Sequence, residues 1–273
     1  GKLSLGCVTC GDGTWSCLFI NGLCTANCFF CPQDRGIKEE RPPTTDKIIF
    51  SNPRDYADYV QKVGFKGVSF SGGESLIVYN TLLSFIRELR QKLGNNIYLW
   101  MYTNGDLVDS AKLEELKQSG LGEIRFNIAA RAYNLHPVEL ALNFIDMVSV
   151  EIPAIPEDFE VVKEALKVMA SIGVKHLNLH QLLATSYNYS AMAHRGYTFL
   201  HHPGLPILES EMTALKLLLY AAENGISLPI NYCSQAYKVR LQGRGNRMRA
   251  APLVLKGFED ITESGYIRRI TIQ

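Results

Sequence analysis

The chain has 273 residues, of which 47% are hydrophobic, and a formal net charge of +1. This length fits one large domain or two small ones with a sizeable core, and the near-neutral charge argues against a strongly basic nucleic-acid binder or an acidic tail. No stretch approaches 18 consecutive apolar residues, and the first residues lack the apolar core of a secretory signal. We therefore expect a cytoplasmic protein that does not enter a membrane.

Six of the seven cysteines lie within the first 31 residues. In the cytoplasm, cysteines are better explained as metal ligands or reduced thiols than as disulfides. Cys7 and Cys10 form a C-x2-C pair between Gly6 and Gly11, and glycines let a backbone fold tightly around a metal. Cys17 follows among apolar neighbours and is the doubtful member of the cysteines available for a second site, because a cysteine there is more often a small buried hydrophobe.

The apolar run Leu18–Ile20 ends at Asn21-Gly22, which predicts a buried strand leading into a loop. That loop carries Cys24, Cys28 and Cys31 with the spacing C-x3-C-x2-C. Three thiolates this close can hold one iron–sulfur cluster, and a [4Fe-4S] cluster with three cysteine ligands keeps its fourth iron open. A zinc knuckle or a group of reduced thiols is the alternative. Zinc sites, however, usually add a second cysteine pair or a histidine pair at a fixed spacing, and this loop has no histidine pair nearby.

This cysteine spacing, with the aromatic Phe30 just before the third cysteine, resembles the signature of radical S-adenosylmethionine (radical SAM) enzymes. The resemblance implies that the amino and carboxylate groups of SAM chelate the open iron. An electron from the cluster would then split SAM to a 5'-deoxyadenosyl radical. It also implies that Phe30 contacts the adenine.

Residues 32–51 are polar and contain Pro42-Pro43, so they predict an exposed excursion. Apolar residues at helical spacing follow up to Gly64, and then comes the strand Gly67–Ser71. The next residues, Gly72, Gly73 and Glu74, are similar to the G-G-E motif of the same family, although Ser75 replaces its usual proline. The motif implies backbone groups exposed to SAM and a Glu74 carboxylate that helps to hold the methionine ammonium.

The next two strands also end in polar residues. The strand Ile97–Tyr102 runs into Thr103, Asn104 and Gly105, which look like the T-N-G of many family members, although the tripeptide alone is equally consistent with an ordinary turn. Near the end of the strand 123–128, Asn127 could reach the ribose or the carboxylate of the cofactor.

Two further strands carry polar residues in apolar surroundings. Glu151, in the strand 147–152, is expected inside the barrel, paired with another group, or on an exposed edge. In the strand 176–182, Asn178 and His180 share one face by alternation, which indicates a lined cavity or satisfied structural residues.

The strand 228–233 brings the isolated Cys233. With Cys7 and Cys10 it is expected to ligate a second site, an auxiliary iron–sulfur cluster, with structural zinc or free thiols as alternatives. The stretch 224–258 contains no Asp or Glu but has several Lys and Arg residues. These residues predict either a patch that faces a phosphate, a carboxylate or an acidic polypeptide, or a solvated basic face.

Strand and helix alternate about six times, which predicts parallel strands with crossover helices, an α/β fold. Six units look like the partial (β/α)6 TIM-like barrel of radical SAM enzymes. We expect an N-terminal extension at residues 1–17, a barrel core at 18–225 and a C-terminal extension at 226–273. Parallel α/β folds bind ligands at the carboxyl ends of their strands, where the cysteine loop, Gly72–Glu74 and Asn127 all fall.

The resemblance covers the barrel and is closer to the branch of pyruvate formate-lyase activating enzyme, although the Cys7–Cys10 pair and the residues after Leu182 depart from that branch. It implies a SAM-cleaving enzyme that abstracts hydrogen from a peptide, a protein or a small anionic molecule and takes electrons from ferredoxin or flavodoxin. The alternatives are an enzyme that inserts sulfur or methylthio groups into tRNA or a small molecule, and a non-enzymatic iron–sulfur protein for electron transfer or redox sensing.

Overall fold

A computed structural model of the protein describes residues 2–34, 39–45, 48–201 and 204–269. Its main element is a curved sheet with the strand order β11-β8-β7-β6-β5-β4-β1-β2-β3. The strands from β11 to β1 pair in parallel and form the partial barrel: β1 (Trp15–Asn21), β4 (Gly67–Gly72), β5 (Tyr98–Thr103), β6 (Glu123–Phe126), β7 (Met147–Pro153), β8 (His176–His180) and β11 (Ile230–Cys233). The predicted α/β partial barrel is confirmed, and β11 extends it by one more parallel strand.

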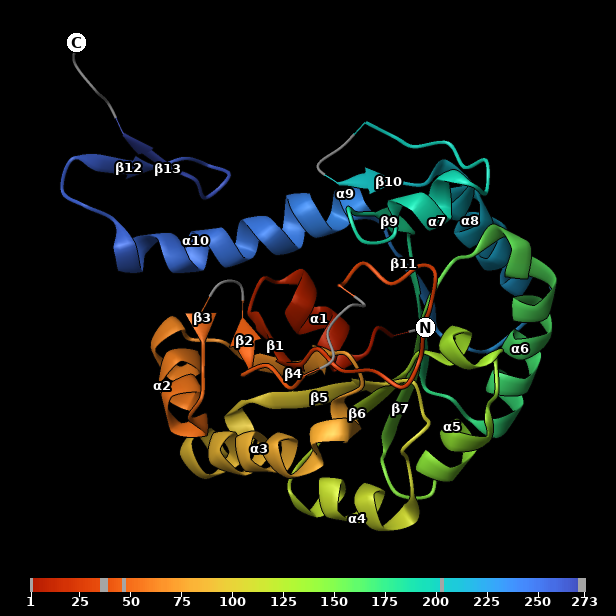
Figure 1. Ribbon diagram of the computed structural model, residues 1–273, viewed down its shortest axis with the longest axis horizontal. Helices are drawn as coiled ribbons and strands as arrows, with labels where there is room; N and C mark the ends of the chain where they lie inside the picture. The colour runs from red at the N-terminus through yellow and green to blue at the C-terminus, as the bar shows by residue number, and fades with distance from the viewer. Residues whose placement is uncertain (1, 35–38, 46–47, 202–203, 270–273) are drawn as a thin grey trace.

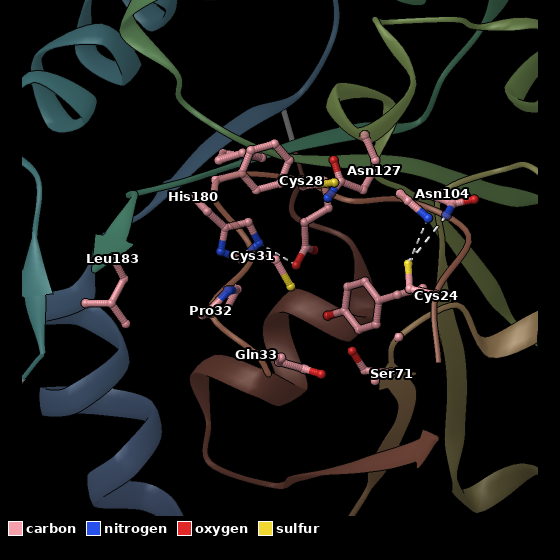
Figure 2. Close-up of a pocket in the computed structure, with 18 of the residues that line it drawn as sticks. Cys24, Cys28, Cys31, Pro32, Gln33, Ser71, Asn104, Asn127, His180 and Leu183 are labelled. Atoms are coloured by element: carbon pink, nitrogen blue, oxygen red, sulfur yellow. Dashed lines mark hydrogen bonds and ion pairs between the residues drawn. The ribbon is translucent and has the colours of Figure 1, made fainter. Parts of the chain in front are cut away.

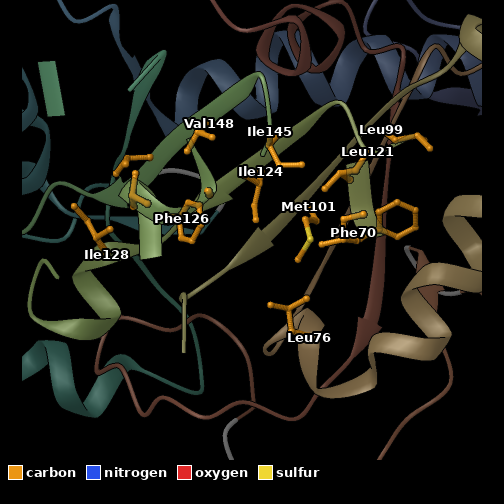
Figure 3. Packing of buried hydrophobic residues seen from close by; sticks show 14 of the residues in the cluster. Phe70, Leu76, Leu99, Met101, Leu121, Ile124, Phe126, Ile128, Ile145 and Val148 are labelled. Carbon is orange, nitrogen blue, oxygen red and sulfur yellow. The ribbon is translucent and has the colours of Figure 1, made fainter. Parts of the chain in front are cut away.

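The crossover helices cover the outside of this curve (Figure 1). They are α2 (Pro53–Val63), α3 (Tyr79–Leu93), α4 (Ser110–Gln118), α5 (His136–Ala141), α6 (Phe159–Ile172) and α8 (Leu208–Glu223). Each buries an apolar face against the sheet, and Figure 3 shows residues of this core, among them Phe70, Met101, Ile124 and Phe126. Because alternate strand residues take up this outer core, the remaining ones point into the barrel, where the polar residues gather.

The N-terminal helix α1 (Leu5–Gly11) lies on the inner side of the sheet, against β4 and β5 (Figure 1). Ser4 caps it by accepting a hydrogen bond from the backbone N–H of Cys7 at 3.1 Å. The fit is tight, because a Cβ on Gly6 would lie 2.3 Å from Nη2 of Arg125. The helix therefore fills part of the barrel interior and brings Cys7 and Cys10 with it.

After β11 the chain forms α9 (Gln235–Tyr237), a π-helical turn (Lys238–Gln242) and α10 (Gly243–Val254), then a hairpin of β12 (Glu259–Ile261) and β13 (Ile267–Arg269). The backbone of α10 lies in close contact with the backbone just after α1. A Cβ added to Gly13 would lie only 2.4 Å from Cα of Gly245. Figure 1 shows the hairpin standing away from the barrel. The C-terminal extension is thus packed against the N-terminal one.

The remaining elements are short: β2 (Thr44–Thr45) and β3 (Ile48–Ile49) add antiparallel strands at the sheet edge, and β9 (Leu183–Ala184), α7 (Tyr189–Ala193) and β10 (Leu205–Pro206) follow β8. The predicted excursion at 32–51 therefore pairs in part with β1, while its residues 35–38 and 46–47 lie outside the described ranges. Among the helices described, none has the length and the hydrophobicity needed to cross a membrane.

Candidate active site

A cavity of about 380 Å³ opens at the carboxyl ends of the parallel strands (Figure 2). Eleven of the site residues expected from the sequence line it: Cys24, Cys28, Phe30, Cys31, Gly72, Gly73, Thr103, Asn104, Asn127, Glu151 and His180. Glu74 and Asn178 lie beside the cavity without lining it. Residues that are far apart in the sequence therefore meet where a parallel α/β fold binds its ligands.

The cysteine loop is held in place by its own backbone and by Asn104. The backbone N–H of Cys31 donates to the carbonyl of Cys28 at 3.1 Å, which closes a tight turn. Asn104 Nδ2 donates to Thr25 Oγ1 at 2.9 Å and lies 3.8 Å from the sulfur of Cys24. Figure 2 shows Asn104 directed at Cys24 in this way. Asn104 thus supports the loop itself, a contact that the sequence did not indicate.

Gly72 and Gly73 press against the start of this loop. An added Cβ on Gly73 would lie 1.6 Å from the carbonyl oxygen of Leu23, and one on Gly72 would lie 2.2 Å from that of Asn21. Gly72 also has φ of +126°, in the region that favours glycine. Backbone hydrogen bonds join the two segments, from Gly73 to Asn21 at 3.1 Å and from Glu74 to Leu23 at 2.7 Å. The glycines are therefore required by the protein's own packing.

The expected contact of Glu74 with a ligand ammonium does not agree with the structure. Its side chain is fully buried, and its carboxylate accepts hydrogen bonds from Thr103 Oγ1 at 2.8 Å, the N–H of Asn104 at 2.7 Å and the N–H of Leu76 at 3.1 Å. Burial raises the pKa of this carboxyl. Glu74 instead ties the turn after β4 to the turn after β5, so it orients the backbone that faces the cavity.

Asn127 follows β6 and lines the cavity with an unsatisfied side chain. Its Oδ1 is buried and has no hydrogen-bond partner among the described residues, although its backbone N–H donates to the carbonyl of Thr103 at 2.9 Å. An unmet buried acceptor costs free energy unless a ligand supplies the donor. This orphan oxygen, the three thiols and the glycine turn together fit a cofactor that has both metal-bound and polar organic parts.

The side of the cavity near Phe30 is apolar. Phe30 lines it with Leu182 and Leu183, and the ring of Phe29 packs edge-on against Phe30 with centroids 5.4 Å apart. Asn188 Nδ2 donates a hydrogen bond to the carbonyl oxygen of Phe30 at 3.1 Å. This apolar wall suits a flat heteroaromatic ring.

Glu151 lines the cavity from the barrel interior and joins a buried ionic network. Its Oε2 accepts from Arg125 Nη1 at 2.6 Å, and Arg125 Nε donates to Glu123 at 2.7 Å. Arg125 also lies over the rings of Trp100 and Tyr102. Burial alone would raise the pKa of Glu151, but His180 and Arg125 outweigh burial and hold it well below its usual range. Glu151 is therefore ionised and fully engaged.

His180 connects this network to the C-terminal extension. Its Nε2 lies 2.5 Å from Glu151 Oε1, and its Nδ1 lies 2.8 Å from Nζ of Lys238, which also lines the cavity. Burial, and next the Lys238 charge, lower the pKa of His180. Asn178 Nδ2 stands 3.4 Å from His180 Nε2, below the cavity surface. Both ring nitrogens of His180 are thus occupied by protein groups.

The second cysteine group lies on the inner side of the barrel. Burial raises the pKa of Cys7, Cys10 and Cys233, and the thiols of Cys233 and Cys7 add to the effect on Cys10, which places the three within electrostatic reach of one another. Glu151 acts on all three as well, so this group lies close to the cavity wall. In neither cysteine group, as far as the chain is described, do three sulfur atoms converge on one point as metal ligands would. Side-chain rotation would have to bring them together.

Several residues of the cavity were not identified in the sequence. Trp15, Tyr102 and Lys238 line it, and so does Cys17, which was expected to be a buried hydrophobe. Strand β1 begins at Trp15, earlier than predicted, so Trp15 and Cys17 face the interior by simple alternation. That alternation was the available signal, while Lys238 was one of several cations in the predicted basic segment 224–258 and nothing local distinguished it from the others.

The basic segment does not form one open patch. Arg244 and Arg247 donate to the carbonyls of Glu263 and Ser264 at 2.7 and 3.0 Å, and Arg249 donates to the carbonyls of Gly13 and Gly64 at 3.3 Å each. These arginines fasten α10 and the hairpin to the rest of the protein. Lys238 alone of the basic segment faces the cavity.

Comparison with known proteins agrees with this geometry. The radical SAM superfamily model matches residues 18–183. A Methanocaldococcus jannaschii protein that is provisionally named a glycyl-radical enzyme activating enzyme is 30% identical over 280 residues, which cover 98% of this chain and 73% of that protein.

Two solved structures share the fold. The chain is similar to native anSMEcpe with bound AdoMet, with a TM-score of 0.57 and 12% identity over 88% of this chain and 66% of that one. It is also similar to Streptococcus suis SuiB bound to the precursor peptide SuiA, with a TM-score of 0.55 and 13% identity over 90% of this chain and 52% of that one. The chain thus spans between about half and two thirds of the length of these structures.

Proposed function

The chain belongs to the radical SAM superfamily, and from this membership we propose that it acts on a peptide or protein substrate, from which it removes a hydrogen atom. The observation that carries the proposal is the meeting of Cys24, Cys28 and Cys31 with the Gly72–Gly73 turn and the orphan oxygen of Asn127 in one cavity. Two observations favour a polypeptide: the name of the M. jannaschii relative, and the precursor peptide bound to SuiB.

In this proposal Cys24, Cys28 and Cys31 hold a [4Fe-4S] cluster. The cluster, when bound and reduced, supplies the electron that cleaves SAM to the 5'-deoxyadenosyl radical. The backbone of Gly72 and Gly73 receives the methionine end of SAM, and Glu74 fixes that backbone through Thr103 and Asn104.

The organic part of SAM has its own contacts. Asn127 Oδ1 accepts a hydrogen bond from the ammonium or the ribose of SAM, which removes the cost of its unmet acceptor. Phe30, with Leu182 and Leu183, covers the adenine. Electrons come from a small reductant such as ferredoxin or flavodoxin.

The second group, Cys7, Cys10 and Cys233, is proposed to hold an auxiliary iron–sulfur cluster, with zinc as the alternative metal. Cys233 is buried and Cys7 and Cys10 are partly buried, and the raised pKa of all three makes them costly to ionise. A metal ion offsets that cost because it binds the thiolate form. A reading in which the basic segment binds tRNA is not favoured, because its arginines hold backbone carbonyls.

The test is anaerobic reconstitution with iron and sulfide, reduction with dithionite, and measurement of 5'-deoxyadenosine formed from SAM. We expect deoxyadenosine from the wild type and none from Cys28→Ala. Cys17→Ala, which changes a cavity cysteine outside both ligand groups, should keep its iron. Iron of about eight rather than four atoms per chain supports two cubane clusters. A fully assembled and reduced protein that forms no deoxyadenosine, with or without added peptide, would contradict the proposal and favour an electron-transfer or sensing role.

A further inference from the structure

Lys238 places a cation in the cavity without a carboxylate partner. It comes from the π-helical turn of the C-terminal extension, and Nζ has one hydrogen bond among the described residues, to Nδ1 of His180 at 2.8 Å. An ammonium can only donate, so Nδ1 is the acceptor in this bond and Nε2 carries the hydrogen that points to Glu151. Two further donors of the ammonium remain for the cavity.

The nearest carboxylates cannot neutralise this ammonium directly. Glu151 uses one oxygen for His180 and the other for Arg125, and Arg125 also holds Glu123. Among the described residues, the His180 imidazole therefore separates Lys238 from the closest carboxylate. A partly buried ammonium in this position gains most from an anionic ligand.

A second donor faces the same cavity. The hydroxyl oxygen of Tyr102 accepts from Trp100 Nε1 at 3.2 Å and from Arg125 Nη1 at 3.5 Å, so its own hydrogen is not used in these bonds. The indole of Trp15 also lines the cavity, fixed by a hydrogen bond from its Nε1 to Ser69 at 2.9 Å. The lining of the cavity thus combines cationic and phenolic donors with an aromatic surface.

We propose that Lys238 binds a carboxylate of the substrate and thereby places the reacting carbon in the cavity. The inference rests on the proposed function, since it assigns the group by which the polypeptide is recognised, an acidic side chain or a C-terminal carboxylate. The His180–Glu151 pair acts as a positioning element that keeps the Lys238 ammonium directed into the cavity. The carboxylate of SAM is the other source of the same chemistry, and the experiment separates the two.

The test uses the reconstituted holoenzyme with SAM and without reductant, so that no turnover occurs. Isothermal titration calorimetry measures the binding of two matched pairs, acetate with acetamide and phenylacetate with phenylacetamide. We expect the wild type to bind each carboxylate at least about tenfold more tightly than its amide, as a charge-assisted hydrogen bond implies. Lys238→Met should remove this preference, and Lys238→Arg should retain most of it. Arg240→Met, an exposed cation two residues away, should behave as the wild type.

Two results would overturn the assignment. One is a wild type that binds the carboxylates no better than the amides, including one that binds neither. The other is a Lys238→Met variant that loses affinity for SAM itself, because Lys238 would then hold the cofactor's carboxylate. Deoxyadenosine formation by the same wild-type sample after reduction tests the proposed function separately, so failure of one can be told from failure of the other.

Discussion

Replacing Gly73 by alanine tests whether the cysteine loop depends on the glycine turn. The new Cβ would lie 1.6 Å from the carbonyl oxygen and 2.4 Å from the carbonyl carbon of Leu23. Both are backbone atoms, so no side-chain rotation can relieve the overlap and the two segments must separate. The separation would weaken the hydrogen bonds from Gly73 to Asn21 and from Glu74 to Leu23.

The expected cost follows from these contacts. Overpacking costs about 1–3 kcal/mol, and each of the two strained hydrogen bonds adds up to about 1 kcal/mol, so the total is about 1–5 kcal/mol. At about 2–4 °C per kcal/mol for a chain of this size, the melting temperature falls by about 2–20 °C. The displaced loop should also bind less iron, because Cys24 follows Leu23 directly.

Thermal unfolding of the reconstituted protein, with iron and sulfide counted per chain, measures both effects. Gly257→Ala is the matched control, because an added Cβ there meets no atom within 4 Å. The reasoning is refuted if Gly73→Ala has the same melting temperature as the control and binds as much iron as the control does.

The other predictions concern single groups at the cavity. Cys10→Ser should lower the iron content by about half while SAM cleavage continues, and metal analysis with a deoxyadenosine assay checks this. Glu151→Gln should destabilise the protein by about 3–5 kcal/mol at pH 7, because it breaks a buried ion pair. The folded-state pKa of Glu151 is depressed, so its contribution is present above the unfolded-state value of 4.5 and is lost as the pH falls below it. The difference in urea-unfolding free energy from the wild type should therefore shrink toward pH 4, and a constant difference would contradict the assignment. Asn127→Ala should weaken SAM binding about tenfold in calorimetry without lowering the melting temperature of the SAM-free protein, since Oδ1 has no protein partner to lose. A variant that binds SAM as the wild type does would refute the role of Asn127.

Much of the barrel could be predicted because its signals are local. Each parallel strand is a short apolar run, and helices such as α2 and α6 end at glycines with positive φ, Gly64 and Gly173. A strand end is also where polar residues can leave the core. For this reason the sequence alone predicts that the turns carrying Gly73, Asn104 and Asn127 lie at one end of the sheet, and all three line the cavity there.

Side-chain roles were harder, because they depend on partners far away in the sequence. Glu74 follows two glycines and was expected to reach a ligand, yet its carboxylate accepts hydrogen bonds from Thr103 and Asn104. A motif gives the position of a backbone turn but does not determine which of its groups faces the ligand. Lys238 was seen only as one cation among several, because its contact with His180 spans 58 residues.

The N-terminal and C-terminal extensions both contact the buried ionic network of the barrel. Ser4 accepts from Nη2 of Arg125 at 2.9 Å, so the N-terminal segment satisfies the buried guanidinium that holds Glu151. At the other end, Lys238 holds His180, which contacts the second oxygen of the same carboxylate. Both extensions therefore converge on Glu151, one on each oxygen. Glu151 also borders the cavity and raises the pKa of Cys10 and Cys233, so we expect a change in either extension to alter the surroundings of both candidate cofactor sites.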